Sequence, residues 1–154
     1  MNRVKQLLGL VVGLFCTLIV AGLCSYCFNM DFTWYSQLDK PSFMPSGGYF
    51  TVFVSLTYLS TIWVIARLVA SKKIAPTIVF FVVIGVCSIL FVYLFFSLKQ
   101  IYGSMVFITF TFISSLMLFL KFIARDFVSA IIYFPSLLFN AFCFVIMFAL
   151  AMAN

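Results

Sequence analysis

Five long stretches without a charged residue constrain this chain more than any other feature of its sequence. They are Gln6–Met30, Pro41–Ala66, Ile74–Leu98, Gln100–Leu120 and Phe127–Asn154. Each is long enough for a helix to cross a bilayer core of ~30 Å, which takes about 20 residues. The alternation of apolar and polar residues that a lipid-facing barrel needs is absent. The sequence therefore predicts an all-α membrane protein: one domain over residues 1–154, a bundle of five transmembrane helices, and a structured first loop. The predicted spans are approximately 7–28, 49–69, 75–98, 103–122 and 129–151.

The composition supports this class, since 66% of the residues are hydrophobic and only 8% are charged. A soluble domain needs a surface with roughly a quarter of its residues charged. The first span follows Arg3 and Lys5, as the core of a secretory leader would. Its apolar run is longer than the ~7–15 residues of such a core, so we expect a retained helix.

The basic residues predict an orientation for an integral, multi-pass protein. With alternating helices, seven lie on the side of the N-terminus (Arg3, Lys5, Arg67, Lys72, Lys73, Lys121 and Arg125) and two on the other side (Lys40 and Lys99). In a bacterial inner membrane this bias places the N-terminus in the cytoplasm and the C-terminus on the opposite side. The net charge of +6 reflects this bias and attraction to membrane lipid headgroups. It does not indicate nucleic acid, because the basic residues are scattered over separate turns.

Several kinds of chemistry lack their usual residues in this chain. The sequence contains no histidine, so the common metal sites and the Ser-His and Cys-His nucleophiles are excluded. Asp31, Asp39 and Asp126 all fall outside the predicted spans, whereas proton-coupled transporters normally carry a charge within the membrane. No phosphate-binding GxxxxGK[ST] loop occurs. We therefore expect no enzyme activity, no metal and no required cofactor.

Small residues recur every four positions along the first span, at Gly9, Gly13, Thr17, Ala21 and Ser25. Small side chains let two helix backbones approach closely, which is a main source of packing energy in lipid. The first four of these residues form a candidate dimer face. The pattern fits either packing within the bundle or the seam of a homodimer, and the sequence does not choose between them.

All five cysteines fall within the predicted spans: Cys16, Cys24, Cys27, Cys87 and Cys143. A free cysteine in a helix bundle usually behaves as a small apolar residue. Cys24 and Cys27 have the spacing of a redox or metal pair, but a lone CxxC is a weak signal. Disulfides would require the outer ends of the first and fifth helices to meet in an oxidising compartment.

The first loop carries the motif Trp34-Tyr35-x-x-Leu38-x-Lys40-Pro41-Ser42-Phe43-x-Pro45. Its prolines restrict the backbone, and Gly47-Gly48 permit a sharp entry into the second span. Trp34 and Tyr35 alone would fit an aromatic belt at the membrane boundary. A belt does not require two prolines, a lysine and an aspartate, so we expect this loop to cap something.

This motif, placed after a first membrane span, closely resembles the signature of the TspO/MBR family. That family includes the tryptophan-rich sensory proteins of bacteria and the mitochondrial translocator protein. Two further segments resemble the family, Leu94-Phe95-Phe96 and Tyr133–Phe142, and the resemblance extends along the whole chain. It implies a five-helix bundle, usually a homodimer, with a pocket roofed by the first loop. Family members bind porphyrins such as protoporphyrin IX and haem, sterols, and benzodiazepine-site drugs.

Carried over through these motifs, the resemblance places the ligand-binding residues on three helices and the loop. They are Cys24, Cys27, Trp34, Phe50, Thr51, Phe53, Val54, Phe139, Asn140, Cys143 and Ile146. The family's two pocket tryptophans fall on Val54 and Phe139, so we expect no light-driven degradation of porphyrin. Other departures are Ser46 for the second proline of the loop motif, Ser88 and Phe91 for an Asn and a Trp, and Phe107 for an acidic residue.

The remaining lining predicts a pocket for a flat hydrophobic ligand such as a tetrapyrrole. Asn140 lies in mid-span and needs a polar partner, from another helix or from a ligand. Cys24, Cys27 and Cys143 facing one pocket would make it sensitive to oxidation. Sterol is a weaker candidate ligand: Leu90, Tyr93 and Lys99 satisfy a loose sterol pattern, and Lys99, Tyr102 and Val106 its reverse. A binding and sensing protein is the favoured interpretation; the alternatives are a carrier for such a ligand and a structural protein that has lost the ligand.

Overall fold

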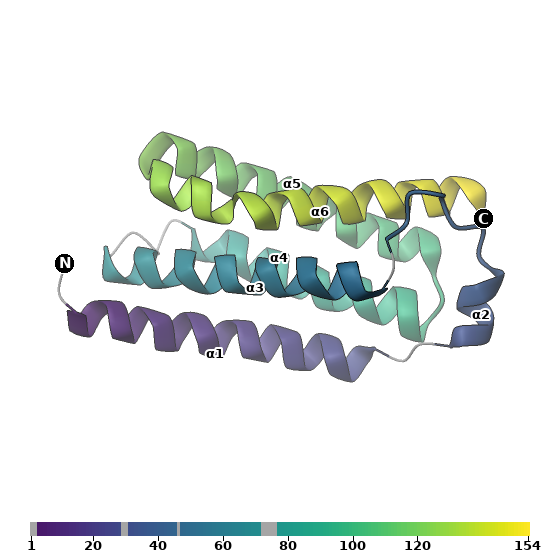
Figure 1. Ribbon diagram of the computed structural model, residues 1–154, viewed down its shortest axis with the longest axis horizontal. Helices are drawn as coiled ribbons and strands as arrows, with labels where there is room; N and C mark the ends of the chain where they lie inside the picture. Colours follow the sequence, from purple (N-terminus) through teal and green to yellow (C-terminus); the bar gives the residue numbers. More distant parts are fainter. Residues whose placement is uncertain (1–2, 29–30, 46, 72–76) are drawn as a thin grey trace.

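The computed structural model describes residues 3–28, 31–45, 47–71 and 77–154. These residues form an elongated bundle of nearly parallel helices, with no strand in the described ranges (Figure 1). The long helices are α1 (Arg3–Cys27), α3 (Gly47–Ala70), α4 (Ile78–Val92), α5 (Ile101–Arg125) and α6 (Phe127–Ala153). The short α2 (Phe32–Gln37) lies in the first loop, and a π-helix, η1 (Tyr93–Ser97), continues α4. Ser46, Lys72 and Lys73, which entered the motif and the charge count, lie outside the described residues.

The predicted all-α membrane fold is confirmed. Five helices of the described ranges are long and apolar enough to cross a membrane, with α4 and η1 together forming the third span, Ile78–Ser97. The observed helix ends differ from the predicted ones by two to four residues at most positions. The π-helix at the end of the third span was not predicted; such turns have no distinctive sequence pattern.

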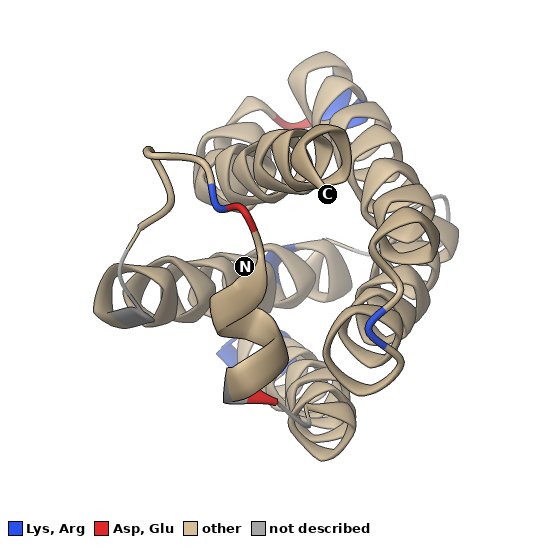
Figure 2. Cartoon of the chain, turned by 90° about the vertical axis from the view of Figure 1, so that its right-hand side faces the viewer, with Lys and Arg blue, Asp and Glu red and all other residues tan. Residues whose placement is uncertain are grey.

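The helices form a closed ring around the bundle axis (Figure 2). α1 packs on α3, α3 on α6, α6 on α5, and α5 on α4, and α4 then returns to α1. Figure 2 looks along the bundle from the end where α2 and the C-terminus lie, and α2 crosses this end of the ring. We call residues 31–45, which include α2, the lid, and the end that they cover the lid end.

The small-residue face of α1 packs within the chain. A Cβ atom on Gly9 would lie 2.5 Å from the carbonyl oxygen of Ala66 in α3, and one on Gly13 would lie 2.8 Å from that of Ile62. Gly9, Gly13 and Thr17 are buried in this contact. The candidate dimer face is therefore wrong for these residues, because α3 already covers them. A homodimer remains a proposal and has to use another surface.

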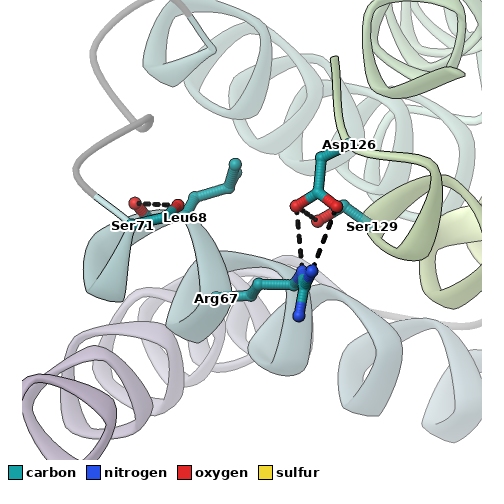
Figure 3. A network of polar contacts seen from close by, with 5 residues as sticks. All are labelled: Arg67, Leu68, Ser71, Asp126 and Ser129. Atoms are coloured by element: carbon teal, nitrogen blue, oxygen red, sulfur yellow. Dashed lines mark hydrogen bonds and ion pairs between the residues drawn. The ribbon is translucent and has the colours of Figure 1, made fainter. Parts of the chain in front are cut away.

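A charged cluster joins α3 to the junction of α5 and α6 at the end opposite the lid (Figure 3). Arg67 donates two hydrogen bonds to Asp126, from Nε at 2.9 Å and from Nη2 at 3.2 Å, and Ser129 Oγ donates a third at 2.8 Å. The Arg67 guanidinium and the Ser129 hydroxyl lower the pKa of the Asp126 carboxyl to about 2. Asp126 thus stays ionised and ties three helices together at one point.

Candidate ligand cavity

A cavity of about 460 Å³ lies inside the ring of helices. Its volume is within the range of about 300–1,000 Å³ that is usual for small-molecule sites. Eight aromatic rings border it: Phe28, Phe50, Tyr58, Phe81, Phe91, Phe96, Tyr133 and Phe139. All five long helices contribute to the wall, although α5 does so only through Ile108. The bundle is therefore not filled by its own phenylalanines, despite its 22 Phe residues.

No charged side chain is found among the described residues that line this cavity. The polar groups of the wall are hydroxyls, thiols and one amide. Three of the hydroxyls bond to a carbonyl of their own helix: Thr17 to Gly13, Thr57 to Phe53, and Ser88 to Ile84. These hydroxyls are already satisfied, so the surface that they offer to a ligand is only weakly polar.

Two polar clusters join helices at the wall. Ser136 Oγ of α6 contacts Ser60 Oγ of α3 and donates to the Thr57 carbonyl at 3.2 Å. On α5, Ser115 Oγ lies 2.9 Å from the Tyr133 hydroxyl and accepts a hydrogen bond from Asn140 Nδ2 at 3.1 Å. A helix therefore supplies the partner that Asn140 needs. Such interhelical bonds are typical of packing in membranes.

The lid packs on a hydrophobic cluster at the end of the bundle. The Trp34 ring meets the Phe95 ring edge to face, with centroids 5.5 Å apart, and Tyr35, Leu38 and Met44 pack on the same cluster. The cluster contains Phe95, Ile108, Cys143, Ile146, Met147 and Leu150. Ile108 and Cys143 also line the cavity, whereas none of the lid side chains that the structure describes does. The lid thus covers the cavity indirectly, through one layer of side chains.

Polar contacts at two points hold the lid in place. At its start, Asp31 caps α2 by accepting from the backbone N–H groups of Thr33 and Trp34, and its other oxygen accepts from Lys99 Nζ at 2.7 Å. The Lys99 ammonium, followed by the Trp34 N–H, lowers the pKa of the Asp31 carboxyl. Further along, the backbone of Asp39 exchanges two hydrogen bonds with the side chain of Asn154 at the end of α6.

The motif residues of the lid contact one another as well as the helix bundle. Lys40 Nζ lies 3.9 Å from the centroid of the Tyr35 ring, a favourable cation–π distance. The Tyr35 hydroxyl contacts Met44 Sδ at 3.7 Å, and burial raises the pKa of that hydroxyl. Pro41 begins a turn in which the Met44 N–H donates to the Pro41 carbonyl at 3.0 Å. The motif therefore specifies a fixed shape for the lid rather than a surface that faces the cavity.

Six of the eleven predicted ligand-binding residues line the cavity: Cys24, Phe50, Val54, Phe139, Asn140 and Cys143. The other five do not. The Cys27 carbonyl accepts a hydrogen bond from Ser97 on the rim, and Trp34 lies in the lid. Thr51 and Phe53 are exposed on the outer side of α3, while Ile146 is buried in the cluster under the lid. The predicted set of three pocket cysteines is therefore wrong at Cys27, and Cys16 takes its place in the wall.

The predicted ligand-binding set contains no residue of the α4 wall, which consists of Phe81, Ile84, Gly85, Ser88, Phe91 and Val92. It also missed Thr57, Tyr58 and Thr61 of α3. For α3 the sequence did contain a signal, because positions 54, 57, 58 and 61 lie on the same helix face as the predicted residue Phe50. For α4 it was weak, because nearly every residue of this helix is apolar and no face stands out.

The sequence profile of the TspO/MBR family matches residues 7–152 of the 154-residue chain. The chain belongs to the TspO/MBR family. It is thus an integral, multi-pass membrane protein of a family of sensing and binding proteins, which are generally not enzymes. The comparison with curated proteins gave no match.

Four positions at which the chain departs from the TspO/MBR pattern lie in the cavity wall. Val54 and Phe139, the positions of the family's pocket tryptophans, both line the cavity, and so do Ser88 and Phe91. Phe107, at the position of the family's acidic residue, does not. The departures from the family pattern are therefore concentrated in the cavity wall, where they change the residues that a ligand would meet.

Proposed function

We propose that this protein binds a flat hydrophobic ligand in the cavity, and that the ligand is a tetrapyrrole such as protoporphyrin IX or haem. The observation that carries the proposal is an aromatic-walled cavity of about 460 Å³ in the bundle. Aromatic rings offer large, rigid surfaces to a planar ligand at little cost in conformational entropy. The known ligands of the TspO/MBR family include both tetrapyrroles and sterols, and the aromatic wall supports the choice of the planar tetrapyrrole.

The charges of a porphyrin restrict how it would lie. Protoporphyrin IX carries two carboxylates, and burying an unpaired carboxylate costs several kcal/mol. Because no described residue of the wall carries a compensating charge, the carboxylates must reach the surface. Ser25 and Phe28, at the end of α1 nearest the lid, are wall residues that are also exposed. The carboxylates would leave the cavity there, at the membrane boundary.

A tryptophan placed in the wall tests this proposal directly. In a background without native tryptophan (Trp34→Phe, Trp63→Phe), Phe139→Trp puts an indole in the cavity, and Leu138→Trp puts one on the adjacent, 54% exposed lipid-facing position. We expect protoporphyrin IX to quench the first indole saturably, with a Kd below about 100 μM, or roughly 5.5 kcal/mol. The second should show only weak, unsaturable quenching by porphyrin dissolved in the detergent. Equal quenching of both would refute binding in the cavity.

A carrier for the same ligand is the second candidate function. Cys16 supports it, because this residue lies in the middle of α1, lines the cavity, and is also exposed on the side of the bundle that faces lipid. The cavity therefore reaches a position from which a lipophile could exchange with the bilayer. Uptake of protoporphyrin IX into proteoliposomes, compared with protein-free liposomes, separates a carrier from a receptor.

We also propose that the N-terminus faces the cytoplasm. By the bounds of the helices, Arg3, Arg67 and Arg125 belong to the end of the bundle opposite the lid, whereas Lys40 and Lys99 lie at the lid end. This distribution supports the orientation that places more positive charge inside. A membrane-impermeant maleimide applied to intact cells should label a cysteine at position 42 in the lid and not one at position 125. Labelling at position 125 and not at position 42 would show that the N-terminus faces the opposite side.

A further inference from the structure

Among the described residues of the cavity wall, Asn140 carries the one carboxamide, and only half of this group is engaged by the protein. It is 8% exposed and lies on α6, one residue after Phe139. Its Nδ2 group donates to Ser115 Oγ at 3.1 Å, and Ser115 Oγ in turn lies 2.9 Å from the Tyr133 hydroxyl. The carboxamide is thus held in one orientation by a buried pair of hydroxyls.

The other half, Oδ1, receives no hydrogen bond from any residue that the structure describes. The described residues also contain no fully buried side-chain oxygen or nitrogen without a partner. Oδ1 is therefore not sealed in the packing between helices, and the open space that Asn140 borders is the cavity. A carbonyl oxygen in mid-membrane without a donor is costly, so it is a strong site for a donor from a ligand.

The surroundings of Oδ1 define what such a ligand can be. The described wall contains no charged group, and the hydroxyls of Thr57 and Ser88 are bonded to carbonyls of their own helices. A charged ligand group would lose its hydration next to Asn140 and gain no ion pair. An uncharged O–H or N–H group would satisfy an acceptor that is already oriented, without reorganisation of the wall.

We infer that Asn140 is a specificity residue of this cavity: its Oδ1 atom accepts a hydrogen bond from an uncharged O–H or N–H group on the edge of a flat hydrophobic ligand. This inference rests on the proposed function and narrows it: the N–H groups of protoporphyrin IX lie at the centre of its ring, so among tetrapyrroles an open-chain one, with N–H groups at its edge, meets Oδ1 better than the closed ring. A flat ligand whose edge inside the cavity is a hydroxyl, a lactam or a pyrrole-type N–H fits the site. The same ring system with only ether or alkyl groups at that edge fits the aromatic wall but leaves Oδ1 without a donor.

A pair of matched probes tests the inference. 1-Hydroxypyrene and 1-methoxypyrene are flat, uncharged and fluorescent, and only the first carries a donor. Binding is followed as energy transfer from Trp34, which lies against Phe95 at the lid end, in a Trp63→Phe background. Each affinity is expressed relative to the partition of the probe into protein-free detergent micelles. We expect the hydroxyl probe to bind roughly threefold to tenfold more tightly, the value of one neutral hydrogen bond.

Two substitutions assign the preference to its residue. Asn140→Leu removes the acceptor at similar volume and should reduce the preference to about one. Tyr58→Phe removes a cavity-lining hydroxyl on α3 and should leave the preference unchanged. Thermal unfolding and gel filtration of both variants establish that they are folded. If Asn140→Leu does not fold, Asn140→Ala removes the same acceptor and takes its place in the comparison.

The outcomes separate this inference from the proposed function. Saturable binding of both probes with equal relative affinity, or a preference that persists in Asn140→Leu, would overturn the role of Asn140 and leave the ligand cavity standing. If Tyr58→Phe loses the preference for the hydroxyl probe, the Tyr58 hydroxyl and not Asn140 is the group that recognises the donor. Absence of saturable transfer for both probes would overturn the cavity as a site for flat ligands, and the inference with it.

Discussion

The close contact between α1 and α3 predicts that a single added methyl group on α1 destabilises the protein. A Cβ atom on Gly9 would lie 2.5 Å from the Ala66 carbonyl oxygen, 2.9 Å from its Cα and 3.0 Å from its carbonyl carbon. All three atoms belong to the backbone of α3, so no side chain can rotate away to make room. Gly9→Ala must therefore push the two helices apart.

The size of the effect follows from what is lost when two packed helices separate. Inserting a methyl group into a close-packed contact typically costs about 1–3 kcal/mol, and in lipid this contact is a main source of packing energy. We expect the apparent Tm in detergent to fall by roughly 2–12 °C, at about 2–4 °C per kcal/mol for a chain of this size. Gly13→Ala should act in the same direction, because its Cβ would lie 2.8 Å from the Ile62 carbonyl oxygen.

Gly22 supplies a matched control in the same helix. A Cβ atom there would have no neighbour within 4 Å. Gly22→Ala should leave the Tm unchanged or raise it slightly, since alanine favours a helix by up to about 1 kcal/mol over glycine. If Gly9→Ala behaves like Gly22→Ala, α1 is not seated on α3 as described. If Gly9→Ala instead changes only the oligomeric state, the small-residue face belongs to a seam between subunits.

Three further predictions concern the charged cluster, the lid and the cavity. Asp126→Asn should destabilise the protein by about 1–3 kcal/mol at pH 7, because it leaves Arg67 without its carboxylate. Since the folded pKa of Asp126 is about 2 and its ordinary value is 3.8, this stability is present above about pH 4 and is lost as the pH falls through 2; acid unfolding of Asp126→Asn should lack that step. Asp31→Ala should increase hydrogen exchange in residues 32–37, whereas Asp31→Asn, which keeps an N-cap oxygen, should increase it much less; equal exchange in both would contradict the cap. Protoporphyrin IX should protect Cys24 from a permeant maleimide and not Cys27, which is absent from the cavity wall; protection of both or of neither would contradict the assigned wall.

The fold could be predicted from the sequence because lipid permits few solutions. A backbone inside a membrane must satisfy its own hydrogen bonds, so five uncharged runs of sufficient length imply five helices. The uncharged runs do not indicate which helices pack against each other. The face at Gly9 and Gly13 shows that some backbone comes close, and only the structure shows that it is the backbone of α3.

The site could be predicted only in part, for a related reason. Along a helix each residue turns the side chain by about 100°, so an error of one position moves a residue off the wall. Phe53 and Cys27 were assigned to the pocket through motifs that are anchored several residues away, and they miss it, whereas Val54 and Cys24 line it. The lid could not be placed either, because its motif describes contacts within the lid and with a cluster that forms only when the helix ends meet.

The retained cavity and the lost tryptophans lead to one conclusion about chemistry. Binding a flat ligand needs a planar, apolar wall, and the wall keeps this at Phe139, whose ring lies 5.4 Å from that of Phe50. Light-driven degradation of a porphyrin would in addition need the oxidisable indoles that the family resemblance places at Val54 and Phe139. The chain has two tryptophans in all: Trp34 lies in the lid, and Trp63 is 58% exposed on the outer side of α3. The cavity wall therefore offers a planar aromatic surface without an indole. We expect protoporphyrin IX bound there to remain intact under illumination.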